Sequence, residues 1–358
     1  MSTPIKVGLA GFGISAKVFH APFFAVMATY TLTTVLERHH ASAAETYPGV
    51  RSVTSMDELL NDKEIELVVI TTPNETHFEY AARALKAGKH VVVEKPFTVN
   101  SNEGTELMKI AAETGRILSV YQNRRYVSDF LTIRQILDAG LLGPIHEFEA
   151  HYDRYRPALR PGAWREVPLP GSGILYDLGP HIIDQALSLF GLPHSLYADI
   201  RRERAHVPVD DYFDLQLYYP ACKVILKGGM LVREPGPRYM IHGLDGSFIK
   251  YGEDPQEAKL RAGELPLGAG FGAEPPEMAG LLHTEQAGKV IYTKMPSLPG
   301  DYGLYYKHLH ETIRGGAPLM EKPAHGFNAV RMIELAIESN RTKRVIECSG
   351  LMDVPYRL

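Results

Sequence analysis

The chain has 358 residues, of which 45% are hydrophobic and 22% are charged, and its formal net charge is −4 at pH 7. This composition predicts a globular protein of two domains with sizeable apolar cores. The acidic balance, without a basic stripe carrying interleaved aromatic side chains, argues against a nucleic-acid partner. No apolar run approaches the length of a membrane helix and no cleavable leader precedes the first strand, so we expect a cytoplasmic protein.

Cysteine and histidine usage suggests neither a disulfide nor a metal. Cys222 and Cys348 lie far apart in the sequence and form neither a C-x-x-C motif nor a metal-binding spacing, which favours a reducing compartment. Two histidine pairs, at positions 39–40 and 308–310, lack a third ligand at a suitable spacing. We therefore expect no metal site.

The first element is a short strand that runs into a glycine-rich turn. Ile5–Ala16 reads I-K-V-G-L-A-G-F-G-I-S-A, an alternating half followed by Gly11-x-Gly13-x-x-Ala16. Gly11 permits the tight turn, Gly13 lets a pyrophosphate approach the backbone, and Ala16 lets the next helix pack closely on the strand. The motif predicts a dinucleotide loop at a helix N-terminus. Its expected cofactor contacts are Gly11, Gly13, Ile14 and Ser15.

Strand and helix patterns then alternate to about residue 122. Further strands are predicted at Thr31–Leu36, Leu67–Ile70, His90–Val93 and Ile117–Val120. Helices are predicted at Thr76–Ala87, before Gly88, and at Ser101–Thr114, before Gly115; Ser55–Glu58 has the spacing of a capping box. Apolar strands joined by helices predict a doubly wound parallel sheet, here a Rossmann domain for a dinucleotide over residues 1–122.

Ligands bind at the carboxyl ends of the strands in such a sheet, so the residues that follow each strand are candidate site residues. Glu37-Arg38 follows Thr31–Leu36. An acid there would bind the adenosine ribose and favour NAD, whereas an arginine would accept the extra phosphate of NADP. Because both stand side by side, the sequence leaves NAD and NADP open.

Two more motifs follow strands. Thr71–His77 reads T-T-P-N-E-T-H, and Glu94-Lys95-Pro96 comes directly after His90–Val93. The first could be a plain turn that caps the next helix, and the second an ordinary solvated charge pair. Their position at the same edge of the sheet as the glycine loop makes both candidates for the ligand site.

From residue 123 the pattern changes to long alternating strands. A helix is predicted at Val127–Asp138, and strands are predicted at Ile145–Tyr155, Leu196–Arg204, Tyr212–Tyr219, Lys223–Val232, Arg238–His242 and Ser247–Tyr251. The short connections at Pro220-Ala221, Glu234–Pro237 and Leu244–Gly246 suit antiparallel neighbours. Gly263–Gly280 reads as a long loop or mobile excursion, and Tyr302–Arg314 and His325–Asn340 as closing helices. We expect a second, α+β domain over residues 123–358, with an open, mostly antiparallel sheet and helices on one face.

The strongest constellation of this half is Gly171–Asp184, which reads G-S-G-I-L-Y-D-L-G-P-H-I-I-D. Asp177 and His181 are four residues apart and share one side of a helix. Because Pro180 fits best in a first turn, we expect Asp177 to be the N-cap. The helix dipole would then favour neutral His181, the form that a general base needs. The alternative is that Asp177 only caps and His181 only packs.

Taken together, the motifs G-L-A-G-F-G, T-T-P-N-E-T-H, A-G-K-H-V-V-V-E-K-P and G-S-G-I-L-Y-D-L-G-P-H-I-I-D resemble the glucose–fructose oxidoreductase and inositol dehydrogenase family, Gfo/Idh/MocA. They occur in order and the likeness spans nearly the whole chain. F-H-A-P at Phe19–Pro22, Q-N-R-R at Gln122–Arg125 and D-R-Y-R-P at Asp153–Pro157 resemble the branch with bacterial NADP-dependent scyllo-inositol dehydrogenases.

The resemblance implies reversible hydride transfer between NAD or NADP and a secondary alcohol of a polyol, inositol or sugar-like substrate. Carried onto this chain, His181 takes the hydroxyl proton, Lys95 stabilises the substrate oxygen, and Asp177 orients His181 or binds a neighbouring hydroxyl. Some members are assigned the reverse, with lysine as the proton shuttle. A homodimer or higher homo-oligomer through the C-terminal sheet is also implied.

The expected site is completed by residues of lower rank. Besides the glycine loop, the expected cofactor contacts are Glu37, Arg38, Thr72, Pro73, Asn74, His77, Glu94, Lys95, Asn123, Trp164 and Arg165. The expected substrate contacts are Lys95, Arg124, Tyr152, Arg154, Asp177 and His181. A catalytically silent dinucleotide-binding sensor or regulator, and a reductase of a non-sugar carbonyl such as a dihydrodiol, remain the alternative functions.

Overall fold

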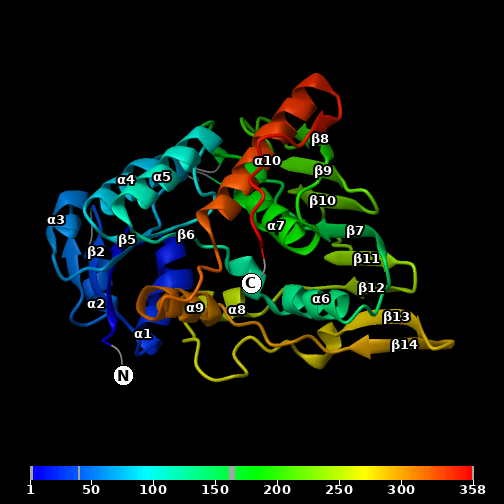
Figure 1. Cartoon of the computed structure of the whole chain (residues 1–358), viewed down its shortest axis with the longest axis horizontal. Coiled ribbons are helices and arrows are strands. Elements are labelled where there is room, and N and C mark those ends of the chain that lie inside the picture. The colour runs from blue at the N-terminus through cyan, green and yellow to red at the C-terminus, as the bar shows by residue number, and fades with distance from the viewer. Residues whose placement is uncertain (1–2, 39–40, 161–165, 357–358) are drawn as a thin grey trace.

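The computed structural model describes residues 3–38, 41–160 and 166–356, which form two sheets side by side (Figure 1). The first sheet has six parallel strands in the order β3-β2-β1-β4-β5-β6. Its strands are β1 Ile5–Ala10, β2 Tyr30–Leu36, β3 Arg51–Val53, β4 Leu67–Ile70, β5 His90–Val93 and β6 Leu118–Val120. The expected doubly wound parallel sheet is confirmed, and β3 is a strand that the sequence pattern did not reveal.

Helices cover both faces of the first sheet, which explains why β4 is apolar throughout and β5 is apolar after His90. On one face the core joins the strands to α3 (Met56–Asn61), α4 (His77–Lys86) and α5 (Ser101–Thr114). On the other face it joins them to α1 (Ala21–Val26), α2 (Ser42–Thr46) and, from the other end of the chain, α9 (Gly303–Gly315).

Local sequence signals set the helix ends. The Asn100 side chain accepts a hydrogen bond from the backbone N–H of Glu103 at the start of α5, and Gly115 ends that helix in the left-handed conformation. Ser55 caps α3 as expected, since the Glu58 N–H donates to Ser55 Oγ at 3.2 Å. The second contact joins Ser55 Oγ to the Glu58 carboxylate at 3.0 Å and not the Ser55 N–H, so only half of the capping box forms among the described hydrogen bonds.

The second sheet has nine strands in the order β14-β13-β12-β11-β7-β10-β9-β8-β15, and all neighbours are antiparallel except β7 and β10. Its strands are β7 Ile145–His151, β8 Ser195–Arg201, β9 Tyr212–Tyr218, β10 Lys223–Gly229, β11 Tyr239–Gly243, β12 Gly246–Lys250, β13 Gly280–Gln286, β14 Lys289–Met295 and β15 Ile346–Glu347. The expected open, mostly antiparallel sheet is confirmed.

One expected strand pairing is wrong. The connection through Glu234–Pro237 does not join neighbours, because β7 lies between β10 and β11 and runs parallel to β10. Residues 230–238 are long enough to cross the roughly 10 Å that separates strands on either side of a third. The hairpin of β13 and β14 also escaped the sequence pattern, since β14 is exposed on both faces and has no apolar alternation.

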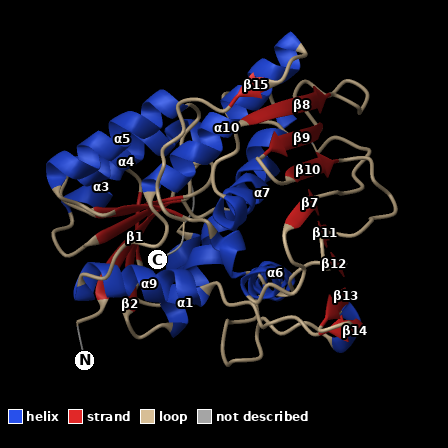
Figure 2. Cartoon of the chain, turned by 45° about the vertical axis from the view of Figure 1, so that its right-hand side comes forward, coloured by secondary structure: helices blue, strands red, loops and turns tan. Residues whose placement is uncertain are grey.

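Helices α6 (Ser128–Asp138), α7 (Ile174–Phe190) and α10 (Pro323–Thr342) lie on the inner face of the second sheet, between it and the first sheet (Figure 2). Helix α10 also reaches the first sheet through Phe327 and Val330. The second half of the chain therefore contributes to the cores of both sheets, and the expected division after residue 122 stays a prediction.

The expected long loop over residues 263–280 is anchored. Lys250 and Glu274 form an ion pair of 2.9 Å whose side chains are almost fully buried. The loop begins after the short helix α8 (Gln256–Arg261), which the sequence pattern did not reveal. Among the described helices, none has the length and apolarity that crossing a membrane would require.

Candidate active site

A cavity of about 1170 Å³ lies between the carboxyl ends of the first sheet's strands and the inner side of the second sheet. It brings together every described residue that the sequence nominated: Gly11, Gly13, Ile14, Ser15, Glu37, Arg38, Thr72, Pro73, Asn74, His77, Glu94, Lys95, Asn123, Arg124, Tyr152, Arg154, Asp177 and His181. The nominated Trp164 and Arg165 lie outside the described residues.

The glycine loop has the shape that a dinucleotide needs. Gly11 has φ +101°, and an added Cβ would lie 3.1 Å from the side chain of Thr71 and 3.2 Å from that of Thr72. At Gly13 an added Cβ would meet no described atom within 4 Å. The residue lines the cavity, so a side chain there would take up space next to a bound ligand. The two glycines therefore leave a bare backbone cradle, which fits a pyrophosphate.

The two residues after β2 have different surroundings. The carboxylate of Glu37 accepts hydrogen bonds from Ser42 Oγ at 2.7 Å, the Ala43 N–H at 2.9 Å and Ser52 Oγ at 3.0 Å. Arg38 is exposed at the cavity edge, and no ion pair engages its guanidinium within the described residues. The Glu37 carboxylate thus binds donors of the protein itself, whereas the Arg38 side chain lines the cavity.

The loop after β4 is fixed by His77. Its two ring nitrogens lie 3.0 Å from the Thr72 carbonyl and 2.8 Å from the Pro96 carbonyl, so the ring joins this loop to the one after β5. Burial lowers the pKa of His77, although the two carbonyls oppose the shift, and a neutral ring donates to only one of them. The Asn74 amide donates to the Gly171 carbonyl at 2.7 Å and ties the same loop to the segment before α7.

The Glu94 carboxylate is a fixed negative charge next to the glycine loop. It accepts from Ser15 Oγ and from the Lys95 N–H, and its Oε1 lies 2.9 Å from His20 Nε2. Burial alone would raise the pKa of Glu94, but His20, Ser15 and Lys95 lower it to about 2. His20 is held in turn by Tyr306, whose hydroxyl lies 2.5 Å from Nδ1. An ionised carboxylate in this place can accept hydrogen bonds from ribose hydroxyls.

Lys95 of the loop after β5 meets Asp177 of helix α7, and His181 lies one turn further along the same helix. The Lys95 ammonium donates to the Asp177 main-chain carbonyl at 2.6 Å and to Asp177 Oδ1 at 3.2 Å. His181 is 8% exposed, and its Nδ1 has no hydrogen-bond partner among the described atoms. Burial and the positive charges of Lys95 and Arg124 lower the pKa of His181 well below its usual value. The imidazole is therefore neutral, which is the form that a general base needs.

Asp177 is not the helix N-cap that we expected. Helix α7 begins at Ile174, and Pro180 lies inside it. The start of the helix is instead satisfied by Asp210, which comes from the connection before β9 and accepts from the Leu175 N–H at 2.7 Å. This external cap allows the helix to begin earlier, so His181 lies two turns inside and its neutral form arises from burial and neighbouring cations rather than from the helix terminus.

Pro180 leaves one helical hydrogen bond of α7 unformed. Because proline has no N–H, the usual helical hydrogen bond from residue 180 to the Tyr176 carbonyl cannot form. The carbonyl of the next residue, Asp177, accepts from Lys95. Main chain and side chain of Asp177 thus hold the ammonium together.

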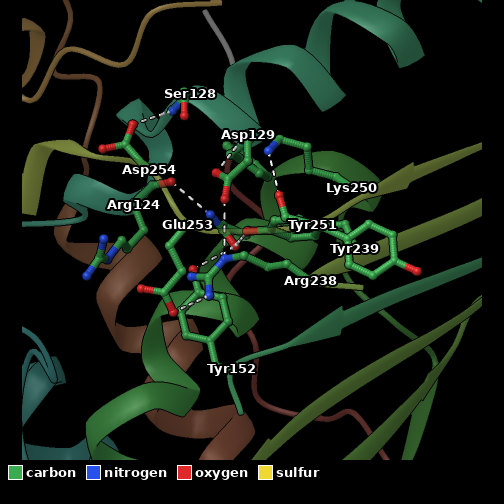
Figure 3. A network of polar contacts seen from close by, with 12 residues as sticks. Arg124, Ser128, Asp129, Tyr152, Arg238, Tyr239, Lys250, Tyr251, Glu253 and Asp254 are labelled. Carbon is green, nitrogen blue, oxygen red and sulfur yellow. Dashed lines mark hydrogen bonds and ion pairs between the residues drawn. The ribbon is translucent and has the colours of Figure 1, made fainter. Parts of the chain in front are cut away.

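Tyr152 and Arg238, which line the cavity, belong to a buried polar network (Figure 3). The Arg238 guanidinium lies 3.9 Å from the ring centre of Tyr152, and it pairs with Asp129 at 3.2 Å and with Glu253 at 2.9 Å. In the same view Arg124 points away from this cluster. Its guanidinium donates to the Tyr302 hydroxyl at 2.8 Å and pairs with Glu257 of α8.

Several residues of the cavity wall were not nominated from the sequence. Among them are charged side chains from the segment after β7, from the position before β11, from the residues after β12 and from α8: Arg156, Arg160, Arg238, Glu253, Glu257 and Arg261. Arg156 had a usable signal, because it lies two residues after Arg154 in an extended segment and so shares its side. The others come from elements whose position no local pattern reveals.

Two family models match the chain. One is described as the oxidoreductase family, NAD-binding Rossmann fold, over residues 5–122, and the other as the oxidoreductase family, C-terminal alpha/beta domain, over residues 134–348. The chain belongs to the Gfo/Idh/MocA oxidoreductase family. Its first sheet is therefore an NAD-binding Rossmann fold, and either NAD or NADP fits the glycine cradle described above. The resemblance inferred from the sequence motifs is confirmed.

Relatives cover almost the whole chain. It is 43% identical to the scyllo-inositol 2-dehydrogenase (NADP(+)) IolW of Bacillus subtilis over 96% of this chain and 95% of that protein, and 41% identical to the oxidoreductase YdgJ of Escherichia coli over 97% and 99%. Among solved structures, the oxidoreductase yvaA of Bacillus subtilis superposes with a TM-score of 0.92 at 42% identity, covering 96% of this chain and 98% of that one.

Proposed function

We propose that the protein is an NADP-dependent dehydrogenase that interconverts a secondary alcohol and a ketone on a polyol or sugar-like substrate. The observation that carries the proposal is the arrangement of Lys95, Asp177 and His181 on one wall of the cavity that the glycine cradle opens into. The NADP dependence of the Bacillus subtilis relative and its action on an inositol support the same reading.

Each of the three residues has a role that its geometry supports. Bound nicotinamide supplies the hydride chemistry. Neutral His181 accepts the hydroxyl proton during oxidation and returns it during reduction. The Lys95 ammonium, held by Asp177, stabilises the negative charge that develops on the substrate oxygen. The reverse assignment, with Lys95 moving the proton, uses the same contacts.

The preference for NADP rests on the residues after β2. A ribose hydroxyl would have to compete for Glu37 with the three donors that already bind its carboxylate. Arg38 is exposed beside it and can pair with a 2′-phosphate, and a charge-assisted contact of this kind is stronger than a neutral hydrogen bond.

Oligomerisation and location complete the proposal. We propose a homo-oligomer through the outer face of the second sheet, because a row of mostly apolar, outward-facing side chains crosses seven strands in register there. The row is Leu281, Ile249, Met240, Glu149, Ile225, Gln216 and Tyr197. We also propose a cytoplasmic location, which the two free cysteines support.

The first experiment is a fluorescence titration of the protein with NADH and NADPH, followed by an absorbance screen with NAD⁺ and NADP⁺ over inositols, hexoses and their keto forms. We expect tighter binding of NADPH and reduction of NADP⁺ by at least one polyol. Tight binding without turnover on any substrate would contradict the proposal and favour the sensor or a reductase of another carbonyl.

A further inference from the structure

The segment after β7 presents two arginines to the cavity. Arg154 and Arg156 both line the cavity, whereas Tyr155 between them lies against Arg233, with the guanidinium carbon 4.1 Å from the ring centre. This alternation is that of an extended chain, in which residues two apart share a side. The two guanidinium groups therefore face the same space.

The backbone that carries them is fixed. The Arg154 N–H donates to the Gly229 carbonyl at 2.9 Å, and the Arg156 N–H donates to the Met230 carbonyl at 2.7 Å. Buried Arg204 donates to the Arg156 carbonyl at 3.3 Å and pairs with Asp211 at 2.9 Å. A preorganised pair of cations loses little freedom when a ligand binds.

Most other cations of the cavity wall are already neutralised by carboxylates. These ion pairs are Lys95 with Asp177, Arg124 and Arg261 with Glu257, and Arg238 with Asp129 and Glu253. Within the described residues, neither guanidinium of Arg154 and Arg156 makes an ion pair or a hydrogen bond, and only their backbone groups are bonded. Asp177 acts on Arg156 only from beyond ion-pair distance, and it already pairs with Lys95.

Both arginines lie close to the reacting groups. The charge of Arg154 is one of the causes that lower the pKa of His181, together with burial. Arg156 is within electrostatic range of Asp177, and burial and the charges of Arg154, Arg160 and Arg261 lower its own pKa. The cofactor's phosphates have their own cradle at Gly13 and Arg38, at the ends of β1 and β2.

We propose that Arg154 and Arg156 bind a carboxylate or phosphate group of the substrate, so that the enzyme acts on an acidic polyol such as a sugar acid or a phosphorylated polyol. Arginine suits this role because its planar fork binds both groups through paired hydrogen bonds. The bound anion neutralises the surplus charge beside His181 and fixes the substrate's orientation. The inference rests on the proposed function and narrows its substrate class.

Inorganic phosphate is the first probe. With the full chain, NADPH and the best keto substrate of the screen, we expect phosphate to inhibit competitively against the substrate and not against NADPH. Arg154→Gln and Arg156→Gln should each raise the inhibition constant of phosphate roughly 10-fold or more. Arg233→Gln, which removes an exposed arginine that faces away from the cavity, is the matched control and should leave it unchanged.

Two results of the phosphate experiment would overturn the proposal. One is an inhibition constant that neither variant changes. The other is competition of phosphate with NADPH together with weaker NADPH binding in both variants, which would assign the arginines to the cofactor's phosphates.

Matched substrates separate this proposal from the proposed function. Glucose is compared with gluconate and glucose 6-phosphate, and myo-inositol with its monophosphate. We expect the anionic partner to have the higher kcat/KM, and the advantage to disappear in the two variants. An equal or higher kcat/KM for the neutral substrate would overturn the proposal of an acidic substrate, and the proposed dehydrogenase activity would still hold. If none of these substrates is turned over, but calorimetry shows phosphate binding that depends on the two arginines, the proposed dehydrogenase activity is contradicted and the anion site is supported.

Discussion

At the scale of single residues, the cavity contains a neutral proton acceptor, His181, and a fixed positive charge, Lys95. His181 is buried among cations and is therefore neutral, whereas Lys95 has a carboxylate and a carbonyl within hydrogen-bond distance. A neutral imidazole beside a held ammonium can accept a proton while the ammonium stabilises the oxyanion left behind.

Lys95→Met should lower kcat by roughly 10²–10³, the loss typical when one preorganised charge or donor is removed from a developing oxyanion. The dissociation constant of NADPH, measured by fluorescence, should change little. Lys109→Met, in the exposed part of α5, is the control and should retain full activity. Turnover of Lys95→Met within a few-fold of the wild type would show that the assigned role is wrong.

Cofactor choice is also decided by single side chains. Arg38→Ser should raise the KM for NADP⁺ roughly 10–100-fold, the effect of losing a hydrogen bond to a charged group, and leave that for NAD⁺ nearly unchanged. Glu37→Ser should affect both cofactors alike, because its carboxylate holds the loop. If the ratio of kcat/KM for the two cofactors stays the same in both variants, the adenosine pocket has been misplaced.

At the scale of elements, the sequence predicted what local signals determine. The limits of α5 follow from Asn100 and Gly115, and β4 follows from its apolar run. It did not predict what distant residues determine: α7 begins early because Asp210 caps it from another connection. For the same reason the site was only partly predictable. Lys95 and His181 belong to local motifs, but Glu257 comes from a six-residue helix too short for a periodic pattern.

The junction of α10 with the first sheet contains a buried acid with an unusual pKa. Glu321 precedes α10, is 3% exposed and accepts a hydrogen bond from the Tyr126 hydroxyl. Burial raises its pKa from the ordinary 4.5 to about 7, although Arg125 opposes the shift. In the unfolded chain the carboxyl ionises near 4.5, so the stability that its protonated form contributes is complete below that pH and is lost as pH rises through 7.

Glu321→Gln should therefore stabilise the protein relative to wild type at pH 8 and hardly at pH 4.5. The shift corresponds to at most about 3 kcal/mol in the free energy of unfolding. Chemical denaturation at the two pH values measures the difference. Glu311→Gln, an exposed residue of α9, is the control and should show no such pH dependence. An equal effect of Glu321→Gln at both pH values would mean that the carboxyl ionises normally.

At the scale of the whole molecule, the inner face of the second sheet is covered by α6, α7 and α10, and the reacting groups of α7 are fixed by that packing (Figure 1). The outer face carries the in-register row from Leu281 to Tyr197, in which apolar side chains predominate. In an isolated antiparallel sheet, the face that points to water usually carries polar side chains. A second copy that covers this row would bury the apolar side chains and stiffen the sheet on which the substrate wall rests.

We expect the 39.8 kDa chain to run as a dimer or larger assembly at micromolar concentration, measured by size exclusion with light scattering. Met240→Glu places a charge in the middle of the row and should shift the population towards monomer, because an unpaired charge is costly to bury. Ile337→Glu, the same kind of change at a 44% exposed position of α10, should leave the assembly intact. A wild-type monomer at this concentration would contradict an interface on this face. A Met240→Glu protein that keeps its mass would mean that the copies meet elsewhere.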